Sequence, residues 1–201
     1  MEYLKFVRIA VAGAMIVACA ASVALAQQPT RVRGTIEKVD GSVLTVKAGE
    51  AGEIKVALAV NAQVFGMTKA TLADVKPNSF IGVGAMPQAD GSQKAIQVTI
   101  FAESQRGLGE GFRPWDRPGS TMTNGAVDTT VAAVEGQVLT VKYKDGEKKI
   151  VVTPESVIRA YVLGDTSELK PGAHVSTFAI KKADGTLEAS RITVGRDGIS
   201  P

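Results

Sequence analysis

The stretch "VRGTIEKVDGSVLTVK", Val32–Lys47, returns later in the chain as "VDTTVAAVEGQVLTVK", Val127–Lys142. Nine of these 16 positions are identical, and both copies carry "VLTVK" after a turn that contains glycine. Two similar stretches at a fixed spacing indicate an internal repeat. The chain is therefore expected to contain two copies of one structural unit.

A second pair of stretches extends the repeat. Residues 76–100 align with residues 170–194 at an offset of 94, against 95 for the first pair, and eight of these 25 positions are identical. The difference of one residue fits a single deletion in the hairpin between the two stretches. We interpret the pattern as a tandem duplication with units 27–101 and 127–201, joined by an ordered Gly/Pro-rich linker over 102–126.

Each unit has the pattern of short strands. Apolar and polar residues alternate in runs that are separated by turn pairs such as Asp-Gly. In the first unit the predicted strands cover 32–39, 43–47, 53–60, 79–86 and 94–101.

Between the third and fourth runs lies "TLADVKP", Thr71–Pro77. Its capping threonine and closing proline predict one or two helical turns. Three strands, a short helix and two strands follow the order of the five-stranded OB barrel. The predicted fold is all-β, with two tandem five-stranded OB-like barrels from an internal duplication. Each has a short helical turn between strands 3 and 4.

The first 26 residues have the composition of a secretory signal peptide. Lys5 and Arg8 precede an apolar run that ends at Ala26 in the small-residue pattern "ALA". This predicts cleavage after Ala26 and a periplasmic or secreted protein. An alternative is "IVAC", a lipobox that would make acylated Cys19 the membrane-anchored N-terminus of the protein.

Charge and aromatic content argue against a nucleic-acid partner. The formal net charge is +3, and it becomes +2 when Glu2, Lys5 and Arg8 are removed with the leader. Nucleic-acid binders cluster basic residues on one face and stack bases on aromatic side chains. Here the aromatic residues are interpreted as isolated core residues. No nucleic-acid partner and no membrane span after residue 26 are expected.

The residues that support catalysis are scarce. His174 is the only histidine, and it aligns with Phe80 of the other copy, so we interpret it as a packing or strand-surface residue. No Gly-x-Ser-x-Gly nucleophile motif is present. Zinc and copper sites require several His or Cys ligands, and Cys19 is the only cysteine. The prediction is a non-enzyme with no catalytic residues, no metal site and no cofactor.

The linker is unusual for a tether because "RGLGEGFRPWDRPGSTMTNG", Arg106–Gly125, contains the only tryptophan. Its prolines restrict the backbone, and Trp and Arg dominate binding hot spots. In one interpretation Trp115 and Phe112 fill the seam between the barrels, and Asp116 pairs with an arginine. In the other, the loop faces a ligand or partner. The candidate binding residues are Arg106, Glu110, Phe112, Arg113, Trp115, Asp116 and Arg117.

Several motifs together resemble a family of uncharacterised exported bacterial proteins with OB-like β domains. The motifs are "RGTIEKVDGSVLTVK", "RGLGEGFRPWDRPGSTMTN", "GQVLTVKYKDGEKK" and "VGRDGISP". Members often carry the label "metal ABC transporter permease". The resemblance implies an envelope protein. The permease label does not fit this chain, because a permease needs several membrane spans and no span is expected after residue 26. Relatives have histidine where this chain has Phe112, so no metal role is expected at that position.

The predicted function is a non-enzymatic periplasmic binding or accessory module. Its recognition element is the loop from Arg106 to Asn124, and its partner is an envelope protein or a small ligand. One alternative is a structural or interaction protein of the envelope, whose loop only locks the two barrels together. A further alternative is a metal-handling accessory protein.

Overall fold

The computed structural model describes residues 28–133 and 136–201. The predicted signal peptide, its cleavage site and Cys19 lie outside these residues. The described residues form an all-β protein whose strands belong to one 12-stranded sheet. The strands are β1 (Thr30–Asp40), β2 (Val43–Lys47), β3 (Glu53–Lys69), β4 (Phe80–Pro87), β5 (Gln93–Ile100), β6 (Gly111–Pro114), β7 (Thr121–Ala133), β8 (Gly136–Tyr143), β9 (Gly146–Val152), β10 (Val157–Leu163), β11 (His174–Lys181) and β12 (Leu187–Gly195).

The first ring is a closed five-stranded barrel. Its strands pair in the order β12, β11, β1, β2 and β3, and β12 returns to β3 in parallel from Leu187↔Val56 to Gly195↔Met67. Side chains that alternate along these strands point inward and are almost fully buried. They include Val32, Ile36, Leu44, Val46, Val56, Val175 and Ile192.

The second ring consists of β5, β4, β7, β8 and β9 in pairing order. It closes where β5 meets β9, over only two residue pairs, Gln93↔Ile150 and Lys94↔Val151. It has an apolar interior of its own, separate from that of the first ring. This interior includes Ile81, Val83, Val98, Val127, Leu139, Val141 and Ile150.

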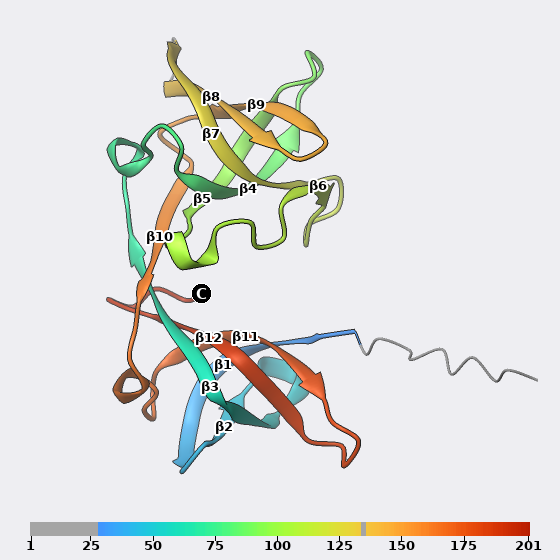
Figure 1. The fold of residues 1–201 in the computed structure, drawn as a ribbon, viewed down its shortest axis with the longest axis vertical. Coiled ribbons are helices and arrows are strands. Elements are labelled where there is room, and N and C mark those ends of the chain that lie inside the picture. The colour runs from blue at the N-terminus through green and yellow to red at the C-terminus, as the bar shows by residue number, and fades with distance from the viewer. Residues whose placement is uncertain (1–27, 134–135) are drawn as a thin grey trace, which may run out of the picture.

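The two rings take their strands from the chain in an interleaved way (Figure 1). β3 does not stop near residue 60, as the sequence pattern predicts, but continues to Lys69, and its second half pairs with β10 and β12. This long strand carries the chain out of the first ring, so β4 and β5 join the second. The predicted units 27–101 and 127–201 therefore each divide between both rings.

The first hairpins of the two rings are built alike. β1–β2 has a bulge between Ile36 and Lys38, and β7–β8 has one between Val127 and Thr129. A Cβ atom at Gly34 would lie 2.0 Å from the Lys47 carbonyl oxygen, and one at Gly125 would lie 2.2 Å from that of Lys142.

The spacing from the glycine to the lysine differs between the two hairpins. The two glycines are 91 positions apart and the two lysines 95 apart, so the second hairpin is four residues longer. At an offset of 91, in place of the predicted 95, the bulges and the closely packed glycines of the two first strands coincide.

The predicted linker is largely structured. It holds a 3₁₀ turn (η3, Glu103–Gln105), strand β6 and the first residues of β7. The segment predicted to be helical, 71–75, forms one 3₁₀ turn (η2, Leu72–Asp74), in which Asp74 accepts hydrogen bonds from Thr71. Among the described residues, no helix is long and apolar enough to cross a membrane.

Candidate functional site

The rings meet at a seam, which we define as the region between them where β3 pairs with β10. Here Phe65 contacts Tyr161, Tyr161 contacts Phe101, and Phe101 contacts Phe80, with ring centroids 6.4, 5.4 and 5.4 Å apart. All three contacts are edge-to-face, the arrangement that aromatic pairs prefer. The prediction that these residues are isolated is wrong, because the exchange of strands brings distant parts of the sequence together.

Trp115 follows β6 and packs against strand β4 of the second ring. A Cβ atom at Gly84 of β4 would lie 2.4 Å from its indole, and a Cβ atom at Gly82 would lie 2.8 Å from Phe101. Two glycines in β4 thus leave a flat strip of backbone that Trp115 and Phe101 cover. The half-buried Trp115 therefore packs against the second ring, whereas the four contacting aromatic side chains described above fill the seam.

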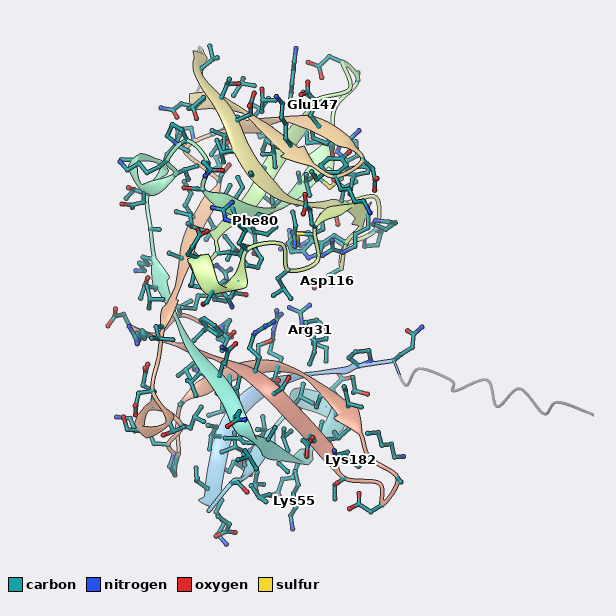
Figure 2. All side chains as sticks on the ribbon, in the orientation of Figure 1. Arg31, Lys55, Phe80, Asp116, Glu147 and Lys182 are labelled. Carbon is teal, nitrogen blue, oxygen red and sulfur yellow. The ribbon has the colours of Figure 1, made fainter. Side chains whose placement is uncertain are left out.

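Asp116 connects the two rings. Its carboxylate accepts a hydrogen bond from the Arg31 guanidinium of β1 at 2.5 Å, and both side chains are partly exposed. Figure 2 shows the two side chains on facing sides of the space between the rings. The Trp115 loop (residues 106–120) is therefore attached to the first ring as well as to the second.

Arg106 and Arg113 are engaged within the protein. The Arg106 guanidinium donates to the Glu103 carboxylate and to the Asn78 carbonyl oxygen, and it lies 6.0 Å from the Phe80 ring centroid. The hydrogen bond to Glu103 raises the pKa of Arg106 and lowers that of Glu103. Arg113 donates to the Gly109 carbonyl oxygen at 2.8 Å. Both arginines therefore hold the shape of the loop.

Phe112, Glu110 and Arg117 have exposed side chains. Phe112 is 40% exposed, and the Lys148 ammonium lies 4.4 Å from its ring centroid. Next to Phe112, residues 114–121 line an open hollow of about 620 Å³. Of the seven candidate residues, these three are the ones most available to a partner.

Hydrogen bonds fix the backbone around this hollow. The Trp115 amide donates to the Ser120 carbonyl oxygen at 3.0 Å. The Ser120 amide and hydroxyl both donate to the Arg117 carbonyl oxygen. Asn124 of β7 donates to the Leu108 carbonyl oxygen and holds the start of the loop. The loop thus presents a surface of defined shape.

Strand β6 borders the hollow and has an open edge. It pairs only with β7, from Gly111↔Asn124 to Pro114↔Thr121. Within residues 28–133 and 136–201, every other strand pairs with at least two strands. An unpaired strand edge can accept a further strand from another chain.

His174 is an exposed residue on β11. Its Nδ1 atom lies 3.0 Å from the Thr35 hydroxyl of the neighbouring strand β1. In the part of the chain that the structure describes, no three His, Cys, Asp or Glu side chains are grouped as metal ligands would be.

A group of arginines at the seam was missed by the sequence reasoning. Arg31 and Arg33 of β1 and Arg159 of β10 lie close to Tyr161 and Asp116. Burial lowers the pKa of Arg33, and the positive charges of Arg31 and Arg159 lower it further. The pattern Arg31-Val32-Arg33 is the signal that could have identified two of them, because alternate residues of a strand share a face.

Comparison of the chain with protein-family models, with curated proteins and with solved structures gives no match. The resemblance to exported OB-like proteins therefore stays a prediction. The geometry of the Trp115 loop and of the seam is what remains to support a function.

Proposed function

We propose that this protein is a non-enzymatic binding or accessory module of the bacterial cell envelope that recognises a protein partner through the Trp115 loop. The main support is the hollow whose backbone is fixed by hydrogen bonds and which lies at the exposed residues Phe112 and Arg117. Aromatic and arginine side chains supply most of the binding energy at protein interfaces. A loop already held in one shape also loses less conformational entropy on binding.

An extended peptide segment is the partner that fits this surface. The open edge of β6 can pair with an added strand, and the hollow can receive one of its side chains. Phe112 and Met86 are both 40% exposed, and a Cβ atom at Gly119 of the hollow would lie 3.9 Å from the Met86 methyl group. This apolar surface supports an apolar side chain as the group that enters the hollow.

We further propose that the fold arose by duplication of one five-stranded OB-like unit, followed by exchange of strands between the copies. Equivalent ion pairs support this origin, since Lys47–Glu37 and Lys142–Asp128 lie at the same place in the two hairpins. The central pairing supports it too. Met67 of β3 lies opposite Tyr161 of β10, its own counterpart 94 positions later.

A second candidate function is a structural envelope protein whose loop only clamps the rings. The Arg31–Asp116 ion pair favours it, because this contact joins the loop to the other ring. Exposed ion pairs contribute only about 0–1 kcal/mol, so this contact alone would hold the loop to the first ring only weakly.

Site-specific photocrosslinking in cells that produce the protein natively separates the two functions. A photoreactive amino acid replaces Phe112 in one variant and Lys55, at the far end of the first ring, in the control (Figure 2). A discrete adduct at position 112 that is absent at position 55 is expected for a recognition loop. The same pattern at both positions, or no adduct at 112, contradicts it.

A further inference from the structure

The outer face of β1 carries two cations toward the seam. Val32 points into the first ring and is buried, so its neighbours Arg31 and Arg33 point out of it. The Arg31 guanidinium lies 5.7 Å from the Phe178 ring centroid on the paired strand β11 and also reaches Asp116. Arg31 therefore has a fixed position between the rings.

β10 adds a third cation from the other side of the seam. Arg159 donates a hydrogen bond to the Ser200 carbonyl oxygen at 3.1 Å and lies 3.6 Å from the Met67 sulfur. Its neighbour on the same face, Tyr161, is held by contacts with Phe65 and Phe101. Burial raises the pKa of Tyr161, whose hydroxyl is protonated at neutral pH and lies beside the Thr193 side chain.

The charges at this place are not balanced. Arg31, Arg33 and Arg159 bring three positive charges to the seam, and Asp116 is the carboxylate close to them. Asp116 is hydrogen-bonded to Arg31, whereas the described residues provide Arg33 with no ion-pair partner. Guanidinium groups donate charge-assisted hydrogen bonds to carboxylate and phosphate oxygens, so a group of three is suited to an oxyanion.

We propose that the seam is a binding site for an oxyanion, a phosphate or carboxylate group, held by Arg31, Arg33 and Arg159. The Tyr161 hydroxyl donates a further hydrogen bond to it. The Asp116 carboxylate accepts a hydrogen bond from the Arg31 guanidinium when the site is empty. The ligand therefore competes with this carboxylate for Arg31. Because Asp116 is next to Trp115, binding changes the environment of the only tryptophan. The site does not depend on the protein partner proposed for the loop.

The test uses residues 27–201, with pyrophosphate and citrate as separate probes at constant ionic strength. Calorimetry and tryptophan fluorescence should both report saturable one-to-one binding of at least one probe. Binding of pyrophosphate alone identifies a phosphate ligand, and binding of citrate alone identifies a carboxylate ligand. Failure of both probes to bind overturns the proposal.

The variant that tests the site most directly is Arg33→Gln, because it leaves the Arg31–Asp116 ion pair intact. Loss of a hydrogen bond to a charged ligand should weaken binding by about tenfold or more. Asp116→Asn should strengthen it, by about two- to fivefold, because the competing ion pair is removed. Lys55→Gln, a matched loss of charge far from the seam, should leave affinity unchanged.

Equal weakening by Arg33→Gln and Lys55→Gln would show general electrostatic attraction and overturn the site. Circular dichroism of each variant checks folding. If Arg33→Gln does not fold, Arg33→Lys keeps the charge but loses the planar, forked donor geometry. Arg33→Lys should bind the probe more weakly than wild type, and wild-type affinity in this variant would contradict the proposal.

Discussion

The first ring and the second ring have five strands each, but the chain builds them differently. All strands of the second ring lie within one continuous stretch, from Phe80 to Val152. The first ring combines the two ends of the described chain, β1–β3 and β11–β12. The long parallel contact between β12 and β3 closes the first ring, whereas two residue pairs close the second. The ring that is continuous in sequence is therefore closed by the shorter contact, and the ring built from two distant segments is closed by the longer one.

The closing strands explain part of this difference. β3 runs through 17 residues without interruption, so it can serve both the first ring and the crossover. In the second half of the chain, Pro154 and the hydrogen bond from the Thr153 amide to the Ser156 hydroxyl separate β9 from β10. Proline has no amide hydrogen for a ladder, so a strand breaks there. The contact between β5 and β9 that closes the second ring is consequently short.

Fragments should give the largest difference between the rings. Residues 70–165 contain every strand of the second ring and should fold alone, with a cooperative urea transition in circular dichroism and in Trp115 fluorescence. Residues 27–101, the predicted repeat unit, lack β11 and β12 and should remain unfolded. A folded 27–101 fragment with an unfolded 70–165 fragment would show that the rings are not interleaved.

Closely packed glycines should give the next largest effect, of similar size in both rings. A Cβ atom at Gly34 or Gly125 would overlap a backbone oxygen, which cannot move aside as a side chain can. Gly34→Ala and Gly125→Ala should each lower the free energy of unfolding by about 3 kcal/mol, the upper end for overpacking. Urea denaturation measures this.

Gly91→Ala is the control for the glycine variants. Gly91 has a positive φ but open space around it, so only a left-handed backbone cost of about 1–2 kcal/mol is expected. An equal loss in all three variants would mean that crowding against the neighbouring strand is not the cause.

The Trp115 loop should show an intermediate effect that belongs to the second ring. Trp115→Ala exposes the flat backbone at Gly84 and should cost about 2 kcal/mol, roughly half the value for a fully buried aromatic. Phe112→Ala, on the same loop but exposed, should change stability by less than about 0.5 kcal/mol. Thermal melts of both variants test this, and equal losses would place Phe112 in a structural role.

A pH-dependent difference should be the smallest and should belong to the first ring. Arg196 donates two hydrogen bonds to Glu168, and these lower the pKa of that carboxyl. A lowered pKa in the folded state stabilises the protein above the unfolded value of about 4.3. This stabilisation is lost as the pH falls through the lower folded value.

Glu168→Gln isolates this contribution, because other carboxyls also titrate in that range. The difference in urea midpoint between wild type and variant should be present at pH 7 and should shrink below about pH 4.3. A difference that stays constant with pH would mean that the charge of Glu168 is not the cause.

Local pattern was sufficient to predict most strands. The runs over 32–39, 43–47 and 94–101 differ from β1, β2 and β5 by at most two residues at either end. Alternation and turn residues determine such segments, and both belong to neighbouring positions in the sequence. The exchange of strands between the two rings could not be predicted in this way. The same hairpins form whether the second half of β3 turns back into the first ring or continues toward the second.

The candidate site was predicted only in part. The Trp115 loop stands out because its composition differs from that of a flexible tether. The seam arginines, in contrast, come from β1 and β10, which are more than a hundred residues apart in the sequence. Only the crossover of β3 and β10 brings Arg33 and Arg159 together, and no local pattern encodes that contact.

The interleaved rings also set the order in which the protein can fold as the chain emerges. Once residue 152 is available, the second ring has all its strands, whereas β1 must wait for β11, since Thr30 pairs with Ala179. Contacts so distant in sequence form slowly, and the waiting strands have unpaired edges that favour aggregation. The first residues of the described chain are therefore among the last to reach their final place, and β1–β3 form the segment that a chaperone would need to protect.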